Sequence, residues 1–163
     1  MSTHPKYHPL ETDGGTRSEV SLDETDRRIL DLLSADCRAS FRTIARKAGI
    51  SPSTLILRIR RLEREGVVTG YRAVVDLARL GYDFFALIEI TIRKGALLEV
   101  QQKIASYAGV VAVYDITGQS DSMALAKCRN RHDFSRLVKK ILALENVERT
   151  NTHVILNVVK EDF

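Results

Sequence analysis

Residues 49–52 constrain the fold most strongly, because they contain a helix stop followed at once by a helix start. Gly49 is able to adopt the left-handed conformation that commonly ends a helix. Ser51 is a favourable N-cap, and Pro52 suits the first helical position, where its missing N–H would have no partner anyway. So short a connection fixes the crossing angle of the two helices that it joins. The sequence therefore predicts a helix-turn-helix.

Residues 21–66 repeat apolar side chains at helical spacing in three runs, which predicts three helices. We expect Ser21 to cap the first helix, with Glu24 completing a capping box. The second helix is expected to begin at Ser40, and the third to end at Gly66.

A short strand pair is expected to follow the third helix. Val67–Val68 and Tyr71–Val75 flank a turn at Thr69–Gly70, and this arrangement is typical of a wing. We therefore assign residues 21–76 to a winged helix-turn-helix DNA-binding domain. The polar residues 1–20, which carry Gly-Gly and two prolines, are expected to form a flexible tail.

Positive charge concentrates within the predicted helix-turn-helix. Residues 40–64 carry seven Lys and Arg side chains against Glu63 alone, a net charge of +6. A phosphate backbone is the obvious partner for such a patch. A solvated helix face would have the same composition, so the charge alone leaves both interpretations open.

The third helix presents a set of side chains suited to DNA. Its apolar stripe of Leu55, Ile59 and Leu62 faces inward, and small hydroxyls followed by arginines remain outside. Such residues suit major-groove reading and phosphate contact. The buried stripe alone does not exclude a three-helix bundle without a DNA-binding role, because such a bundle would need the same stripe. The candidate DNA-binding residues, including one cation of the second helix, are Ser51, Ser53, Thr54, Leu57, Arg58, Arg61 and Arg42.

After a linker at residues 77–82, the sequence changes to alternating helices and strands. The predicted order is β-α-β-β-α-β, a ferredoxin-like domain over residues 83–163, so the fold class is α+β. Asp133 is expected to cap the second of its helices. The expected strands are Phe84–Ile92, Val110–Thr117, Met123–Cys128 and Thr150–Lys160, with a first helix running from Leu97 to Tyr107.

Both faces of the predicted sheet are apolar. Ile88 and Ile90 point to one face of the first strand, and Phe85 and Leu87 to the other. Two helices cover only one face, so a monomer would expose a large apolar patch. We expect the domain to pair sheet to sheet with a second copy, which would also present two recognition helices to a roughly palindromic DNA site.

Three segments resemble the Lrp/AsnC family, the feast/famine transcription regulators. The likeness covers about residues 21–160 and begins with LDETDRRILDLLSADCRASFRTIARKAGISPSTLILRIRRLEREGVVTGYRAVVD, which is similar to the family's winged-helix domain. TGQSD at 117–121 resembles its G-x-x-D turn, and RTNTHVIL at 149–156 its last strand. The resemblance implies a dimer that assembles further, to an octamer or another higher form, and a small-molecule effector that shifts assembly or DNA affinity.

By this resemblance, the effector is expected to be an amino acid held by the G-x-x-D turn. Backbone N–H groups of a glycine turn suit a carboxylate, and Asp121 suits an ammonium group. Gly118 and Asp121 would also serve a purely structural turn, so this alternative stays open. The candidate effector-binding residues are Gly118, Gln119, Ser120, Asp121, Thr150 and Thr152.

The sequence also argues against other classes of protein. No apolar run approaches the ~20 residues of a membrane span, and the first 20 residues lack a secretory apolar region. Two cysteines fit reduced thiols in the cytoplasm. No metal or resident cofactor is expected, because prolines flank His4 and His8, the one pair with helical ligand spacing.

The leading hypothesis is a sequence-specific transcription regulator, not an enzyme, with double-stranded DNA and further copies of itself as partners. One alternative is an architectural protein that wraps DNA with little sequence preference. Another is a haem-precursor decarboxylase of similar architecture. Beyond the tail only His132 and His153 would serve such chemistry, and an enzyme has no need of the basic patch.

Overall fold

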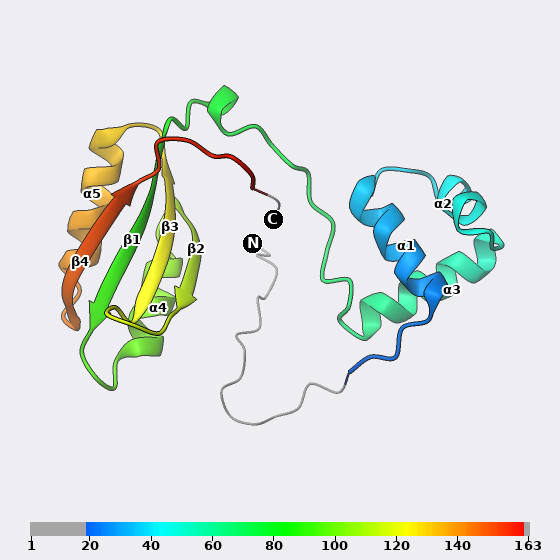
Figure 1. Ribbon diagram of the computed structural model, residues 1–163, viewed down its shortest axis with the longest axis horizontal. Coiled ribbons are helices and arrows are strands. Elements are labelled where there is room, and N and C mark those ends of the chain that lie inside the picture. Colours follow the sequence, from blue (N-terminus) through cyan, green and yellow to red (C-terminus); the bar gives the residue numbers. More distant parts are fainter. Residues whose placement is uncertain (1–18, 162–163) are drawn as a thin grey trace. The chain divides into compact units, whose positions relative to one another are not determined.

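The computed structural model describes residues 19–161, so most of the expected tail at residues 1–20 lies outside the described part. The described residues divide into two compact units with a boundary between Val74 and Val75 (Figure 1). Within residues 19–161, no helix has the length and apolar character needed to cross a membrane.

The first unit contains the three expected helices, α1 (Glu24–Ala35), α2 (Phe41–Ala48) and α3 (Pro52–Arg64). Their apolar stripes meet in one core, in which Ile29, Ile44 and Leu55 are almost fully buried. Ser40 caps α2 and Ser51 caps α3, each by accepting a hydrogen bond from the backbone N–H three residues later. The helix-turn-helix geometry thus follows from local capping together with one shared core.

The start of α1 differs from the prediction. The N-cap is Asp23 rather than Ser21, and the capping box closes with Asp26 rather than Glu24. The Asp23 carboxylate accepts from the N–H of Asp26 at 2.8 Å, and the Asp26 carboxylate accepts from the N–H of Asp23 at 3.2 Å. This reciprocal pair satisfies two backbone donors that the helix itself leaves free.

Gly49 sets the turn between α2 and α3. Its φ of 72° lies in the left-handed region, and its N–H donates to Arg46 O while the N–H of Ile50 donates to Ala45 O. A side chain destabilises this conformation, so glycine lets α2 end where α3 must begin.

Replacing Gly49 with alanine is expected to lower the free energy of unfolding of this unit by about 1 kcal/mol, because a non-glycine residue is strained in the left-handed region. Urea unfolding measures the change. Gly70→Ala is the matched control, since Gly70 has no left-handed φ and nothing near its Cβ position. Equal stability of the two variants would contradict the argument.

The expected wing strands do not form in the single chain. Neither Val67–Val68 nor Tyr71–Val75 is assigned as a strand. The backbone after α3 instead closes back on the helix, because the N–H groups of Val67 and Val68 both donate to Leu62 O. Strands this short have little stability without further strands to pair with.

The second unit is a ferredoxin-like sandwich with the expected element order. Its four strands are antiparallel in the order β2-β3-β1-β4, and α4 and α5 lie against one face of the sheet (Figure 1). A short 3-10 helix at Ala78–Leu80 precedes the first strand. The elements are β1 (Phe84–Ile92), α4 (Leu97–Ala105), β2 (Val110–Asp115), β3 (Ser122–Cys128), α5 (Arg131–Leu142) and β4 (Val147–Val154).

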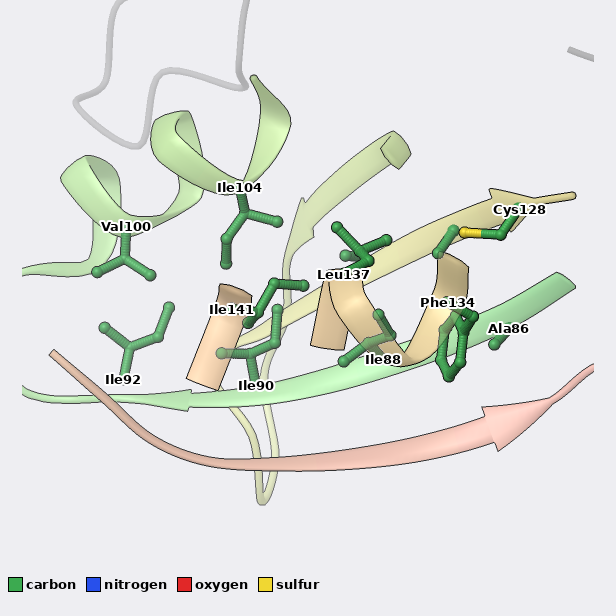
Figure 2. Packing of buried hydrophobic residues seen from close by; sticks show 12 residues of the cluster. Ala86, Ile88, Ile90, Ile92, Val100, Ile104, Cys128, Phe134, Leu137 and Ile141 are labelled. Carbon is green, nitrogen blue, oxygen red and sulfur yellow. The ribbon is translucent and has the colours of Figure 1, made fainter. Parts of the chain in front are cut away.

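The core of this unit lies between the sheet and its two helices (Figure 2). Ile88 and Ile90 of β1 pack towards Ile104 of α4 and Ile141 of α5, and all four are fully buried. The opposite face, which we call the open sheet face, carries Leu87, Met123 and Tyr114 among others. A polar group of Glu89, Asn151 and His153 interrupts this face, with His153 Nε2 at 3.3 Å from a Glu89 carboxylate oxygen.

Several boundaries in the second unit differ from the predictions. α4 ends at Ala105 rather than Tyr107, β2 ends at Asp115 rather than Thr117, and β3 begins at Ser122 rather than Met123. Asn130, not Asp133, caps α5, because the Asn130 side chain accepts from the N–H of Asp133. The last strand runs over Val147–Val154 instead of Thr150–Lys160. Beyond Val154, the N–H of Ile155 donates to Phe85 O, and the described residues after it make no further backbone hydrogen bond to β1.

Candidate DNA-binding and effector sites

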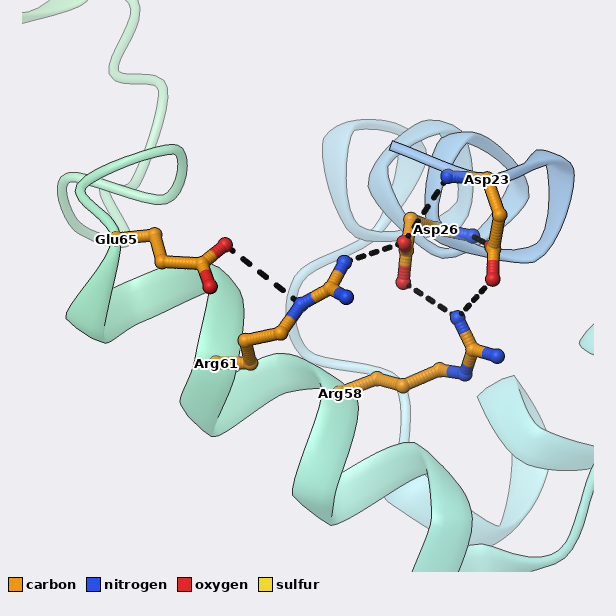
Figure 3. A network of polar contacts seen from close by, with 5 residues as sticks. All are labelled: Asp23, Asp26, Arg58, Arg61 and Glu65. Carbon is orange, nitrogen blue, oxygen red and sulfur yellow. Dashed lines mark hydrogen bonds and ion pairs between the residues drawn. The ribbon is translucent and has the colours of Figure 1, made fainter. Parts of the chain in front are cut away.

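A charge network joins the start of α1 to the middle of α3 (Figure 3). The Asp26 carboxylate is fully buried and binds both Arg58, at 2.8 Å, and Arg61. Arg58 also reaches Asp23 at 2.6 Å, and this hydrogen bond lowers the pKa of Asp23 and raises that of Arg58. Two cations on one buried carboxylate make the network part of the α1–α3 contact.

The side chains of Arg58 and Arg61 therefore point towards α1, and not outward from α3 as the sequence analysis predicts. Their side chains are about one-third exposed, at 28% and 34%, and their guanidinium groups point towards α1. The Nε of Arg61 is buried without a hydrogen bond and lies 3.6 Å from a carboxylate oxygen of Glu65. A role in phosphate contact remains a prediction for both residues, but their present partners compete with it.

Four other residues define the outward line of α3. Ser53, Leu57, Arg60 and Arg64 follow one another at three- and four-residue spacing, opposite the buried stripe of the helix. Leu57 is 67% exposed, and in this position it suits apolar contact with a thymine methyl group. Arg60 and Arg64 are missing from the sequence-based candidates, although this spacing was enough to find them.

The predicted hydroxyl residues lie at the start of α3. Ser53 and Thr54 are exposed, as is the capping residue Ser51. Ser51 Oγ lies 2.9 Å from Ser53 Oγ and 2.8 Å from Thr54 Oγ1, so the three hydroxyls form one hydrogen-bonded group. Their exposure leaves them accessible to base edges, in the position that recognition helices use.

The second helix adds cations beside the turn. Arg42, Arg46 and Lys47 are exposed and form no ion pair within the described residues. A helix that crosses the DNA backbone requires such unpaired cations. Arg42 thus lies exposed on α2, the predicted second helix, on the same helix as two other cations, Arg46 and Lys47.

Tyr71 ties the segment after α3 to the helix. Its hydroxyl donates to Glu63 at 2.9 Å. Burial and this carboxylate raise the pKa of Tyr71 to about 12, so the phenol stays neutral at physiological pH. The hydrogen bond holds this segment near the end of α3 without strand pairing.

The predicted effector turn is fixed by Asp121. Its carboxylate accepts from the N–H of Ile92 at 2.7 Å, and its own N–H donates to Ile90 O. Gly118 has a left-handed φ of 124°, while Gln119 is exposed and Ser120 is buried. Asp121 thus anchors the β2–β3 turn to the end of β1, whatever else it binds.

Thr150 and Thr152 lie apart from that turn. They pair with Ile90 and Ile88, and so belong to the helix-covered face of the sheet at the β4 edge. β1 runs between β4 and β3, the strand that follows the turn. The structure therefore brings Gly118, Gln119, Ser120 and Asp121 together, and places the two threonines on the far side of β1.

Comparisons with known proteins agree with this architecture. Residues 22–69 match a winged helix-turn-helix DNA-binding family, and residues 85–163 match the Lrp/AsnC ligand-binding domain. An uncharacterised HTH-type transcriptional regulator of Pyrococcus furiosus is 42% identical over 88% of this chain and 97% of its own length.

Two solved structures share the fold over most of both chains. AsnC of E. coli has a TM-score of 0.82 at 26% identity, covering 88% of this chain and 98% of its own. A transcriptional regulator of Neisseria meningitidis, solved as a complex with L-Met, has a TM-score of 0.81 at 25% identity, covering 86% and 94%.

The two domains together define a DNA-binding regulator with a ligand-binding module. The chain belongs to the Lrp/AsnC family of transcriptional regulators. The predicted family and fold class are thereby confirmed.

Proposed function

We propose that this protein is a sequence-specific regulator whose DNA affinity or assembly is tuned by an amino acid, and that it acts in the cytoplasm without catalysing a reaction. The outward line of α3 is the observation that carries the DNA-binding part. Leu57 there is exposed beside Arg60 and Arg64, which form no ion pair within the described residues, and a purely structural helix bundle does not require such a surface.

In this proposal α3 enters the major groove and α2 crosses the backbone. Ser53, Thr54 and Leu57 contact base edges, whereas Arg42, Arg60 and Arg64 contact phosphates. Arg58 and Arg61 act indirectly in this proposal. Their ion pairs with Asp26 fix the crossing of α1 and α3, and so the position of α3 for DNA.

We also propose that the chain works as a dimer that assembles further, with an octamer as one form. The open sheet face supports the dimer, since Leu87, Met123 and Tyr114 have no helix over them. A two-fold dimer presents two copies of α3, which suits a palindromic site.

The amino-acid part rests on the ligand-binding domain and on the structural relative that is complexed with L-Met. The β2–β3 turn offers backbone N–H groups for a carboxylate. The Asp121 carboxylate, already fixed by Ile92, supplies a charge for an ammonium group. Thr150 and Thr152 would need a second chain or a ligand that spans β1 to share this site.

Replacing Asp121 with asparagine is expected to abolish the amino-acid response while the protein stays folded. The amide oxygen keeps an acceptor for the N–H of Ile92, so the free energy of unfolding should change by no more than about 1 kcal/mol. The charge for an ammonium group is lost. Titration of the DNA-bound fraction with each amino acid measures the response.

Asp115→Asn is the matched control, because Asp115 is exposed at the end of β2, close to the same turn. It should keep the parent's response. A full response in the Asp121→Asn protein would make Asp121 a structural residue only.

The test of the DNA-binding function is a competition between DNA fragments. A fragment from upstream of the gene itself should be preferred over unrelated DNA by about 10³-fold or more if the protein is a specific and autoregulatory regulator. Equal binding to all fragments would favour an architectural role. Turnover of a tetrapyrrole by the purified protein would instead revive the decarboxylase alternative.

A further inference from the structure

The outer face of α5 in the ligand-binding domain is strongly basic. Residues 129–140 carry five Lys and Arg side chains against Asp133 alone, a net charge of +4. The buried residues of this helix, Phe134, Leu137 and Ile141, point into the core. His132, Arg136 and Lys139 lie opposite them, Arg131 and Lys140 lie on the two flanks, and Arg129 comes just before the helix. We call this surface the α5 basic face; its residues are Arg129, Arg131, His132, Arg136, Lys139 and Lys140.

Few of these charges have a partner. Arg136 pairs with Asp133 at 2.6 Å, and Arg129 lies over the ring of Tyr82. Arg131, Lys139 and Lys140 are exposed and form no ion pair with any described residue. Three cations of one helix are therefore available to an external anion.

Helix stability does not account for this arrangement. Lys139 and Lys140 suit the negative C-terminal end of the helix dipole, but Arg131 and His132 lie in the first turn, where cations are unfavourable. Arg136 and Lys140 are also four residues apart, a spacing at which like charges repel. The cations of the first turn, Arg131 and His132, thus oppose the helix dipole, so helix stability does not explain their placement.

The rest of the domain is balanced, so the charge is local. Residues 84–128 carry four basic and four acidic side chains, and residues 141–161 carry two basic and three acidic ones. The positive charge of the ligand-binding domain thus resides on α5.

We propose that the α5 basic face binds the DNA backbone, as a second contact surface beyond the helix-turn-helix. This inference rests on the proposed DNA-binding function. The eight-residue step from Arg131 to Lys139 spans about 12 Å of helix. A duplex carries one phosphate charge per about 1.7 Å of its axis, so that length meets several phosphates.

The position of α5 also fits this role. The helix lies on the sheet face opposite the open sheet face, so a pair of domains joined sheet to sheet leaves α5 on the outside (Figure 1). DNA that meets this outer helix gains a sequence-independent contact, which lengthens the protected site without adding base specificity.

The test neutralises the three unpaired cations together, as Arg131→Gln/Lys139→Gln/Lys140→Gln. The control removes the same charge from exposed residues of the β1–α4 region, as Arg93→Gln/Lys94→Gln/Lys103→Gln. Affinity for a duplex of about 150 bp, one persistence length, is measured against salt concentration for the full-length parent and both variants. Each lost phosphate contact lowers the slope of log K against log salt by about 0.9, so the α5 variant should lose about 2 to 3 and the control nothing.

An equal slope for the α5 variant and the parent would overturn the inference and leave the proposed function intact. An equal loss in both variants would also overturn it, because the effect would then be one of net charge. Failure of the parent itself to bind DNA would contradict the proposed function. Unchanged DNA binding with lost binding to phosphatidylserine vesicles would assign the face to a membrane instead.

Discussion

Asp26→Asn is expected to lower the free energy of unfolding of the helix-turn-helix unit by about 2–3 kcal/mol. Breaking a buried ion pair costs about 3–5 kcal/mol when the remaining charge is fully buried. Here Arg58 and Arg61 are about one-third exposed, so water relieves part of the loss. The neutral amide also places an N–H₂ group against two guanidinium donors, and the capping contact to Asp23 weakens.

Thermal and urea unfolding of the full chain measure this effect. A loss of 2–3 kcal/mol in so small a unit corresponds to about 10 °C or more in its Tm. Asp31→Asn is the control, because Asp31 is exposed on the same helix and pairs with no cation in the described part of the chain. A change below about 0.5 kcal/mol for Asp26→Asn, as for an ordinary surface substitution, would refute the structural role of the network.

The second large effect is expected in DNA binding. Arg60→Gln/Arg64→Gln should leave stability nearly unchanged, since both side chains are exposed and form no ion pair with residues 19–161. Binding should weaken at low salt, and the slope of log K against log salt should fall by about 2, because two phosphate contacts are lost. Salt titrations on one operator fragment measure it.

Arg58→Gln/Arg61→Gln is the matched comparison, since it removes the same charge from the same helix. This variant should lose stability, and at a temperature where it is folded its salt slope should stay close to the parent's. A flattened slope for this pair, together with a normal slope for Arg60→Gln/Arg64→Gln, would show that the network opens on DNA and that Arg58 and Arg61 contact phosphates after all.

The sequence predicts these helices well where local chemistry decides. Ser40, Gly49 and Ser51 act within their own turns, so their capping roles follow from residue type and spacing. The start of α1 is different, because Ser21 and Asp23 are both good caps. Asp23 is the N-cap because it also contacts Asp26 and Arg58. The contact with Arg58 depends on a residue far away in the sequence, so local sequence does not reveal it.

Arg58 and Arg61 show the same limit at the candidate site. They border the outward set on a helical projection, and only the crossing of α1 and α3 turns them towards Asp26. Periodicity assigns a residue to a face, but the partner of an edge residue depends on tertiary packing.

The predicted strand boundaries are wrong for a related reason. Apolar residues continue from Ile155 to Val159, yet β4 ends at Val154, which pairs with Ala86. Beyond Val154, the backbone bond to β1 within the described residues is from the N–H of Ile155 to Phe85 O. The N–H groups of Val67 and Val68 likewise donate to Leu62 O and do not pair with another strand. A strand needs a neighbour, and the pattern of one segment does not supply it.

The most direct test of a ligand-tuned, sequence-specific regulator is the binding of purified protein to fragments of its own genome, sequenced with and without a pool of the twenty amino acids. The account predicts a few sharp peaks, including one near the protein's own gene, that shift in strength with one amino acid. Broad coverage that ignores the amino acids would contradict it and would identify a protein that compacts DNA.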